Sequence, residues 1–150
     1  MIEVYRLHSS RYPAMNGEGA AIYGGRWNRK GFEVIYTSES RSLAILEILV
    51  HYAVLPKDFL LTPIRIPNHV ATLSLPDSAL PVGWNQASPI AATEDLAMQF
   101  YPNAAVLRVP SAIVTEESNY VLNPAHPDFR HIEFLAPEPF RFDPRLKQTM

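Results

Sequence analysis

Glycine and proline are distributed very unevenly along this chain, and their distribution limits what it can fold into. Five of the six glycines lie before residue 32, and thirteen of the fourteen prolines lie from Pro56 onward. Glycine permits backbone conformations and close contacts that a Cβ atom would block, so the first segment is expected to form a shaped loop. Proline fixes φ and lacks an N–H donor, so the later two-thirds favour short strands and turns over long helices.

The composition is that of one globular domain. The length of 150 residues suits a single domain, and 47% hydrophobic residues can bury a sizeable core. Charged residues make up 19% and the net charge is -2, which excludes a disordered chain. The chain has no cysteine, which excludes a disulfide framework and a thiolate zinc site. We predict a single domain over residues 1–150.

The same sequence also indicates where the protein works. No apolar run approaches the ~18 residues that a membrane span needs. The first residues include an acid, Glu3, and no apolar signal-peptide core. The mild acidity argues against a surface that holds nucleic-acid phosphates. We therefore expect a cytoplasmic protein that binds neither membranes nor nucleic acid directly.

Apolar periodicity and turn residues predict an α+β domain with short strands, more strand than helix, and a buried central helix. Strands are expected over residues 2–7, 33–37, 59–66, 70–75, 104–109, 132–135 and 140–142. A first helix, capped by Ser38 or Ser40, is expected to continue to about Val54. A second is expected over residues 89–100, with Ser88 or Thr93 as its cap. Residues 14–31 and the polar stretch 111–129 are expected to form loops and turns.

The first predicted helix holds the most informative acidic residue. It is apolar nearly all round, and a helical wheel places Ala44, Glu47 and His51 on the one strip without large aliphatic side chains. Glu47 would therefore face a cleft from the middle of the helix. Two interpretations stay open at this point, because the carboxylate can serve a reaction or form a structural pair with His51 four residues on.

Residues 24–28, Gly-Gly-Arg-Trp-Asn, form a second candidate site. Two glycines expose backbone N–H groups, and Arg26 offers a planar fork for phosphate oxygens. Trp27 could stack on a ligand ring, or it could fill the core beside an ordinary turn. The lysine and hydroxyl of a Walker-type phosphate loop are missing.

Other common site types are not supported. His126, Asp128 and His131 lie close in sequence, but the intervening proline predicts a turn, and zinc-type spacing is absent, so we expect no metal site. No Gly-x-Ser-x-Gly elbow marks a serine nucleophile. Taken alone, Tyr36 and Ser111 each look structural.

Several ordered motifs together resemble the RES-domain family. Residues 24–28 and 34–40, followed by Leu46, Glu47 and His51, resemble the front half of these proteins. Residues 109–112, Asn119 and residues 122–127 resemble the back half. The arginine, glutamate and serine for which the family is named match Arg26, Glu47 and Ser111. The resemblance extends over nearly the whole chain and is weakest over residues 56–103.

The resemblance implies a toxin of a bacterial toxin–antitoxin pair, with a fold like that of ADP-ribosyltransferase toxins, acting on NAD+. The residue chemistry agrees. Arg26 could clamp the pyrophosphate, and Tyr36 or Trp27 could hold the cationic nicotinamide ring. Breaking the nicotinamide–ribose bond leaves positive charge on the sugar, which a fixed carboxylate stabilises. NAD+ is then the substrate, and no cofactor or metal is required.

We therefore predict an enzyme that degrades NAD+ by cleaving the nicotinamide–ribose bond, through hydrolysis or phosphorolysis. In this prediction Glu47 is the catalytic carboxylate, Arg26 the principal cation for NAD+, and Tyr36 the aromatic residue beside nicotinamide. Ser111 positions ribose or phosphate. The predicted substrate-binding residues are Trp27, Asn28, Asn119 and Asn123.

Three alternatives and one partner accompany this prediction. The alternatives are a mono-ADP-ribosyltransferase with a protein acceptor, an inactive NAD+-binding or scaffold module, and a ribonuclease. The last is disfavoured because the chain has no basic stripe. The resemblance also implies a helix-turn-helix antitoxin of the Xre class that covers the NAD+ cleft, and a homodimer of this chain could form within that complex.

Overall fold

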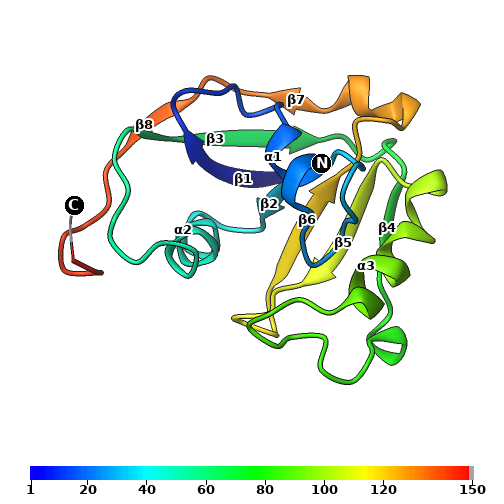
Figure 1. Ribbon diagram of the computed structural model, residues 1–150. Coiled ribbons are helices and arrows are strands. Elements are labelled where there is room, and N and C mark those ends of the chain that lie inside the picture. Colours follow the sequence, from blue (N-terminus) through cyan, green and yellow to red (C-terminus); the bar gives the residue numbers. More distant parts are fainter. Residues whose placement is uncertain (149–150) are drawn as a thin grey trace.

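The computed structural model describes residues 1–148, whose strands form one mixed, strongly twisted sheet (Figure 1). The strand order is β4-β5-β6-β2-β1-β3-β7, and β8 also pairs with β3. Only β4 and β5 pair in parallel among these described strands. The strands are β1 (Ile2–Ser9), β2 (Ile35–Ser38), β3 (Phe59–Ile66), β4 (Thr72–Ser74), β5 (Val106–Pro110), β6 (Ser118–Leu122), β7 (Glu133–Phe134) and β8 (Glu138–Phe140).

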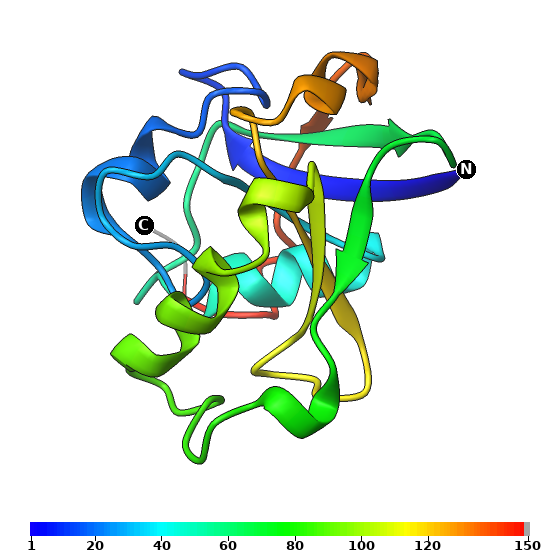
Figure 2. The same cartoon turned by 90° about the vertical axis from the view of Figure 1, so that its right-hand side faces the viewer.

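The short strand β2 joins two parts of the sheet that run in clearly different directions. In Figures 1 and 2, β1 and β3 cross the upper part of the molecule, while the axes of β4, β5 and β6 are oriented steeply. Tyr5 of β1 lies opposite Ser38 of β2, and Ser38 lies opposite Asn119 of β6. Directly opposed residues share one face of a sheet, so these three side chains are on the same face.

The two faces of the sheet bury different apolar clusters. One face carries a cluster that includes Ile35, Ile64 and Leu122. The other carries two clusters. One involves Leu61 and the helix α2 (Arg41–Leu49), and the other involves Val121 and the helix α3 (Ala91–Met98). Residues that line the functional cavity described below belong to both of these clusters, so the cavity lies where they adjoin.

Helix α2 begins as predicted but ends early. Ser40 is its N-cap, and its hydroxyl accepts a hydrogen bond from the Leu43 N–H at 3.1 Å. The helix ends at Leu49 instead of continuing to Val54, and Lys147 donates to the Leu49 and Tyr52 carbonyls at 2.6 and 2.7 Å, which satisfies acceptors at and beyond the helix end. Burial of the helix on nearly all sides was also wrong, since Leu46 and Val50 are exposed.

Two elements lie where loops were expected. Helix α1 (Glu18–Tyr23) occupies part of the glycine-rich segment, and β6 occupies part of the polar stretch 111–129. The apolar pattern did not predict strand β6, because its first two residues are polar. Each of them forms a side-chain hydrogen bond within the fold. Ser118 accepts a hydrogen bond from Arg108 Nε at 3.0 Å, and Asn119 faces a carboxylate.

Smaller differences concern element boundaries. Strand β4 is shorter than predicted, β8 begins two residues earlier, and α3 is two residues shorter at each end. Neither Ser88 nor Thr93, the two predicted caps, is the N-cap of α3. The N-cap is Ile90, and Thr93 Oγ1 donates to its carbonyl at 2.9 Å. The remaining short helices are η1 (Asp77–Ala79), η2 (Tyr101–Asn103) and η3 (Pro127–His131).

Candidate functional site

A cavity of about 580 Å³ opens on the face of the sheet that carries Ser38 and Asn119. Its walls come from α1, the glycine-rich turn at residues 24–27, strands β1 and β2, and α2. Its charged lining residues are Arg6, Arg26 and Glu47. Two arginines and one glutamate therefore line one space, and Arg26 is close enough to Glu47 for the two charges to interact.

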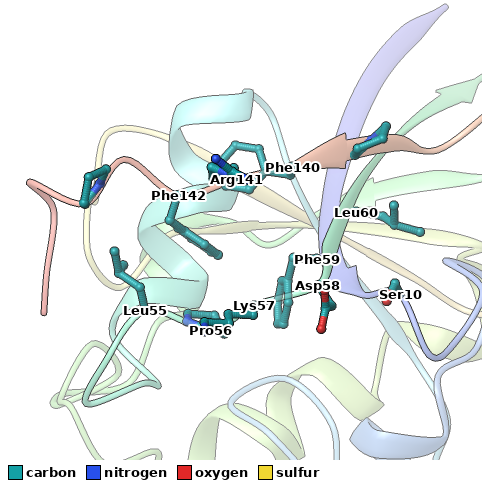
Figure 3. A pocket seen from close by; sticks show the side chains of 12 residues that line it. Ser10, Leu55, Pro56, Lys57, Asp58, Phe59, Leu60, Phe140, Arg141 and Phe142 are labelled. Carbon is teal, nitrogen blue, oxygen red and sulfur yellow. The ribbon is translucent and has the colours of Figure 1, made fainter. Parts of the chain in front are cut away.

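A second, larger cavity of about 790 Å³ has a different character (Figure 3). It lies between the segment after α2, the start of β3 and the C-terminal segment, and it is lined mainly by apolar and proline residues. Its charged residues Lys57, Asp58 and Arg141 are exposed. Among residues 1–148, no side-chain hydrogen bond joins these three groups. The smaller cavity is therefore the candidate site.

Glu47 presents one carboxylate oxygen to the cavity. Its Oε2 accepts hydrogen bonds from Ser111 Oγ at 2.8 Å and from Asn119 Nδ2 at 2.6 Å. Ser111 follows β5 and Asn119 belongs to β6, so the sheet holds a side chain that comes from a helix. No donor within the described chain reaches Oε1, and no buried polar side-chain atom in that part lacks a partner. Oε1 is therefore accessible to a ligand.

The glycine-rich turn brings Arg26 to the cavity. Gly24 has a positive φ of 70°, which favours glycine, and a Cβ on Gly25 would lie 2.7 Å from the Tyr36 hydroxyl. Arg26 Nη1 donates to the Trp84 carbonyl at 2.7 Å. Desolvation lowers the pKa of Arg26, while the neighbouring Glu47 carboxylate opposes that shift. The guanidinium stays charged, with donors left for a ligand.

Tyr36 lines the cavity and is fixed at its hydroxyl. Its Oη donates to Asn28 Oδ1 at 2.5 Å and accepts from the Trp27 N–H at 3.2 Å. Burial raises the pKa of Tyr36, so the phenol is neutral. Asn28 is fully buried and donates to the Ala20 and Phe32 carbonyls. The ring is thus held rigidly in the wall by the glycine-rich segment.

The structure separates the predicted site residues into two groups. Arg26, Trp27, Tyr36, Glu47 and Asn119 line the cavity. The Trp27 side chain, only 3% exposed, fills the core beside the turn, so stacking on a ligand does not fit its position. The other three predicted residues, Ser111, Asn28 and Asn123, lie behind its wall.

The three residues behind the wall each have structural partners. Ser111 is fully buried and bonded to Glu47, and Asn28 is bonded to Tyr36. Asn123 donates to the Tyr101 and Ala104 carbonyls at 3.0 Å, in the core. Direct contact of these three residues with a substrate does not fit this geometry, because their side chains are buried and their polar atoms already bond to protein groups.

Arg6 is a cavity residue that the sequence analysis missed. It donates to the Ala14 and Asn16 carbonyls at 2.6 and 3.2 Å, and within the described residues no carboxylate pairs with it. Desolvation lowers its pKa to about 10, which leaves it charged at neutral pH. The sequence feature that could have identified Arg6 is its position between apolar residues of a predicted strand, where a charged side chain is unusual.

The described residues contain no candidate metal centre. No group of three His, Asp or Glu side chains in residues 1–148 could hold a metal ion. His126 Nδ1 accepts from the Asp128 N–H, while the His131 ring lies edge-on to His69. In the same part of the chain, no helix has the length and apolar character needed to cross a membrane.

Comparison with known proteins gives consistent results. The family model described as RES domain matches residues 3–143. "Toxin Res" of Photorhabdus laumondii is 39% identical over 151 residues, covering 95% of this chain and 96% of that protein. "Prs ADP-ribosylating toxin" of Sphingobium sp. is 38% identical over 139 residues, covering 88% of this chain and 86% of that protein.

A solved structure shows the same fold. A chain of the M. tuberculosis MbcT-MbcA toxin-antitoxin complex superimposes with a TM-score of 0.70. The match covers 97% of this chain and 86% of that chain, at 19% sequence identity. The predicted α+β class is confirmed, and the sheet that carries the cavity belongs to a known architecture.

Proposed function

This chain belongs to the RES-domain family, and from that premise we propose that it is the toxin of a toxin–antitoxin pair that cleaves NAD+ at the nicotinamide–ribose bond. One observation carries the proposal: the accessible Oε1 of Glu47 shares a cavity with Arg6 and Arg26. The names of the curated relatives support the toxin role.

The cavity suits the charge of NAD+. The pyrophosphate carries two negative charges, and the guanidinium groups of Arg6 and Arg26 offer planar donor forks for its oxygens. The nicotinamide ring is cationic and planar, and the Tyr36 ring on the wall can hold it by stacking and cation–π attraction. Pyrophosphate and nicotinamide would then occupy different walls of one cavity.

The reaction needs stabilisation of positive charge and no redox step. As the bond between ribose C1′ and the nicotinamide nitrogen breaks, its electron pair returns to the ring and neutral nicotinamide leaves. The sugar keeps the positive charge, and the Glu47 carboxylate stabilises it. Water then adds and loses a proton to give ADP-ribose, or phosphate adds to give its 1″-phosphate.

A protein acceptor is the second candidate. The Sphingobium relative is named an ADP-ribosylating toxin, and it is 38% identical to this chain. In that case a nucleophilic side chain of a target protein would add to C1′ in place of water. Binding of NAD+ and loss of nicotinamide would proceed with the same cavity residues.

The test is to incubate the purified protein with NAD+ and to follow nicotinamide and the ADP-ribose products. Hydrolysis gives ADP-ribose without phosphate, whereas phosphorolysis depends on added phosphate. Transfer labels a protein when labelled NAD+ is supplied together with a cell extract. The absence of nicotinamide release under all three conditions would reject the proposed function.

The proposal includes an antitoxin of the Xre helix-turn-helix class that covers the cavity. Tyr23 lines the cavity and is 78% exposed, and Ile22 beside it is 63% exposed, so the rim offers apolar contact area. NAD+ should compete with the antitoxin for the free toxin. Full activity at saturating antitoxin would reject occlusion, and a homodimer within the complex stays a prediction.

A further inference from the structure

We propose that Ser38 is a positioning residue that aligns Glu47 through the side-chain amide of Asn119. The proposal rests on the proposed function, because Glu47 is the carboxylate that would face NAD+. Ser38 was a candidate helix cap in the sequence, but Ser40 forms that cap. Its buried hydroxyl, in a residue only 4% exposed, serves another purpose.

The register of the sheet places Ser38 and Asn119 together. The two residues lie directly opposite each other on β2 and β6, although 81 positions separate them in sequence. Ser38 Oγ donates to Asn119 Oδ1 at 2.8 Å. Asn119 Nδ2 then donates to Glu47 Oε2 at 2.6 Å. A chain of two hydrogen bonds therefore connects the strand to the carboxylate.

The chemistry of the three groups sets the direction of this chain. An ionised carboxylate only accepts hydrogen bonds, so Asn119 must turn its NH₂ group toward Glu47. Its carbonyl oxygen then faces Ser38, whose hydroxyl supplies the matching donor. Without that hydroxyl, the amide would lose the contact that holds its NH₂ group toward Glu47.

A second donor fixes the same oxygen from the other side. The Ser111 Oγ accepts from the Ile113 and Val114 N–H groups at 3.1 Å each, so its own hydrogen is left to point at Glu47 Oε2. Two donors from different elements thus converge on Oε2 and orient Oε1 toward the cavity. The carboxylate is thereby already in position when positive charge develops on the ribose.

The first experiment compares two substitutions of equal shape. Ser38→Thr keeps a hydroxyl, whereas Ser38→Val replaces it with a methyl group. Both variants share any packing strain, so the ratio of their kcat values isolates the effect of the hydrogen bond even if both lose stability. We expect kcat for nicotinamide release to be ~10-fold lower in Ser38→Val than in Ser38→Thr, on the scale of one buried hydrogen bond. KM should differ less than twofold, which distinguishes positioning from direct binding of NAD+.

A double-mutant cycle tests the route. In an Asn119→Ala background, the Thr and Val variants at position 38 should have the same kcat, because the amide that transmits the effect is gone. The matched control is Ser118→Ala, which removes a buried serine hydroxyl bonded to Arg108 on the neighbouring position of β6. That variant should keep the parental kcat.

A second readout does not depend on activity. In ¹⁵N-labelled protein, the side-chain NH₂ signals of Asn119 are identified by their loss in Asn119→Ala. Ser38→Val should shift them and speed their exchange with water, whereas Ser38→Thr and Ser118→Ala should leave them in place. Unmoved signals, equal kcat in the Thr and Val variants, or an undiminished difference in the Asn119→Ala background would each overturn the proposal. If the parental protein releases no nicotinamide, the proposed function fails and the NMR result alone decides the alignment of Glu47.

Discussion

Two cavities of this protein differ in size and in chemistry, and the smaller of these two holds the candidate site. The larger, of about 790 Å³, is walled by aromatic side chains that pack on one another, with the Phe140 and Phe142 rings 4.9 Å apart (Figure 3). The smaller, of about 580 Å³, brings together Arg6, Arg26 and Glu47. Convergence of charged groups, and not volume, marks the place where chemistry can occur.

The charged groups of the smaller cavity are also held by residues that are distant in sequence. Arg26 is bonded to the Trp84 carbonyl, 58 positions away, and Glu47 to Ser111, 64 positions away. In the larger cavity, Lys57 and Arg141 are exposed, and no side-chain hydrogen bond within residues 1–148 holds either of them. Preorganisation therefore distinguishes the two, and the following predictions test that distinction.

The largest effect is expected for Glu47→Gln. Glutamine keeps the size of the side chain and its ability to accept from Ser111 and Asn119, but it removes the charge that would stabilise the cationic ribose. Nicotinamide release should fall by at least ~10²-fold, while the thermal midpoint stays near the parental value because glutamine is a comparable helix former. A normally folded variant with near-parental activity would show that Glu47 is structural.

A smaller loss is expected for Arg26→Lys. An ammonium group cannot reproduce a planar fork that binds phosphate while also donating to the Trp84 carbonyl. We expect KM for NAD+ to rise about 10-fold, consistent with the loss of one bidentate contact. Arg29→Lys is the matched control, since Arg29 is exposed and paired with Asp95. Unchanged KM in the first variant would place Arg26 outside the binding site.

In the larger cavity, Phe140→Leu should change stability and leave activity alone. The loss of ring contacts with Phe142 should cost roughly 1–2 kcal/mol, the scale of a moderate loss of packing. For a domain of this size, that cost lowers the thermal midpoint by several degrees. A drop in kcat of more than twofold would show that the larger cavity also affects the reaction, against the distinction drawn between the two cavities.

The smallest effect concerns pH and His8, which joins β1 to β3. Desolvation lowers the pKa of His8, whose Nε2 lies 2.7 Å from Thr62 Oγ1. Between this lowered pKa and the unfolded value near 6.5, the unfolded chain binds more protons. Stability should therefore be fully present above pH 6.5 and decline as the pH falls through the folded pKa.

Melting curves at pH 7.5 and pH 5 measure this effect. The loss of thermal midpoint on acidification should be smaller in His8→Gln than in the parental protein. His69→Gln serves as the control, because His69 is exposed and should leave the loss unchanged. An equal loss of thermal midpoint in all three proteins would show that His8 does not contribute to the pH dependence of stability.

Local patterns predicted the elements whose stability is mainly local. Strand β3 has the bounds that were predicted, because its apolar run is closed by turn residues on both sides. The Ser40 cap was one of two predicted, since capping depends on a hydroxyl and an N–H three residues away. The matches to family motifs likewise predicted Arg26, Tyr36 and Glu47, which all line the cavity.

The missed features depend on contacts between distant segments. Strand β6 has a polar sequence because Asn119 meets a carboxylate from α2, and no window around residue 119 contains that carboxylate. At the end of helix α2, the Leu49 carbonyl accepts a hydrogen bond from Lys147, 98 positions away, which no local window contains. Arg6 looked like one polar residue in a strand until the fold placed it in the cavity wall.

The sequence by itself determined the α+β class, the family and the residue types available for chemistry, because hydrophobic periodicity, capping and motif order are all local properties. Only the tertiary structure decided which oxygen of Glu47 is free and which residues hold the other. Asn119 and Ser111 bond directly to that carboxylate, and Ser38 bonds to Asn119 from the neighbouring strand. A hydrogen bond requires heavy atoms within about 3 Å and a defined angle, and only the paired strands bring residues so distant in sequence to that separation.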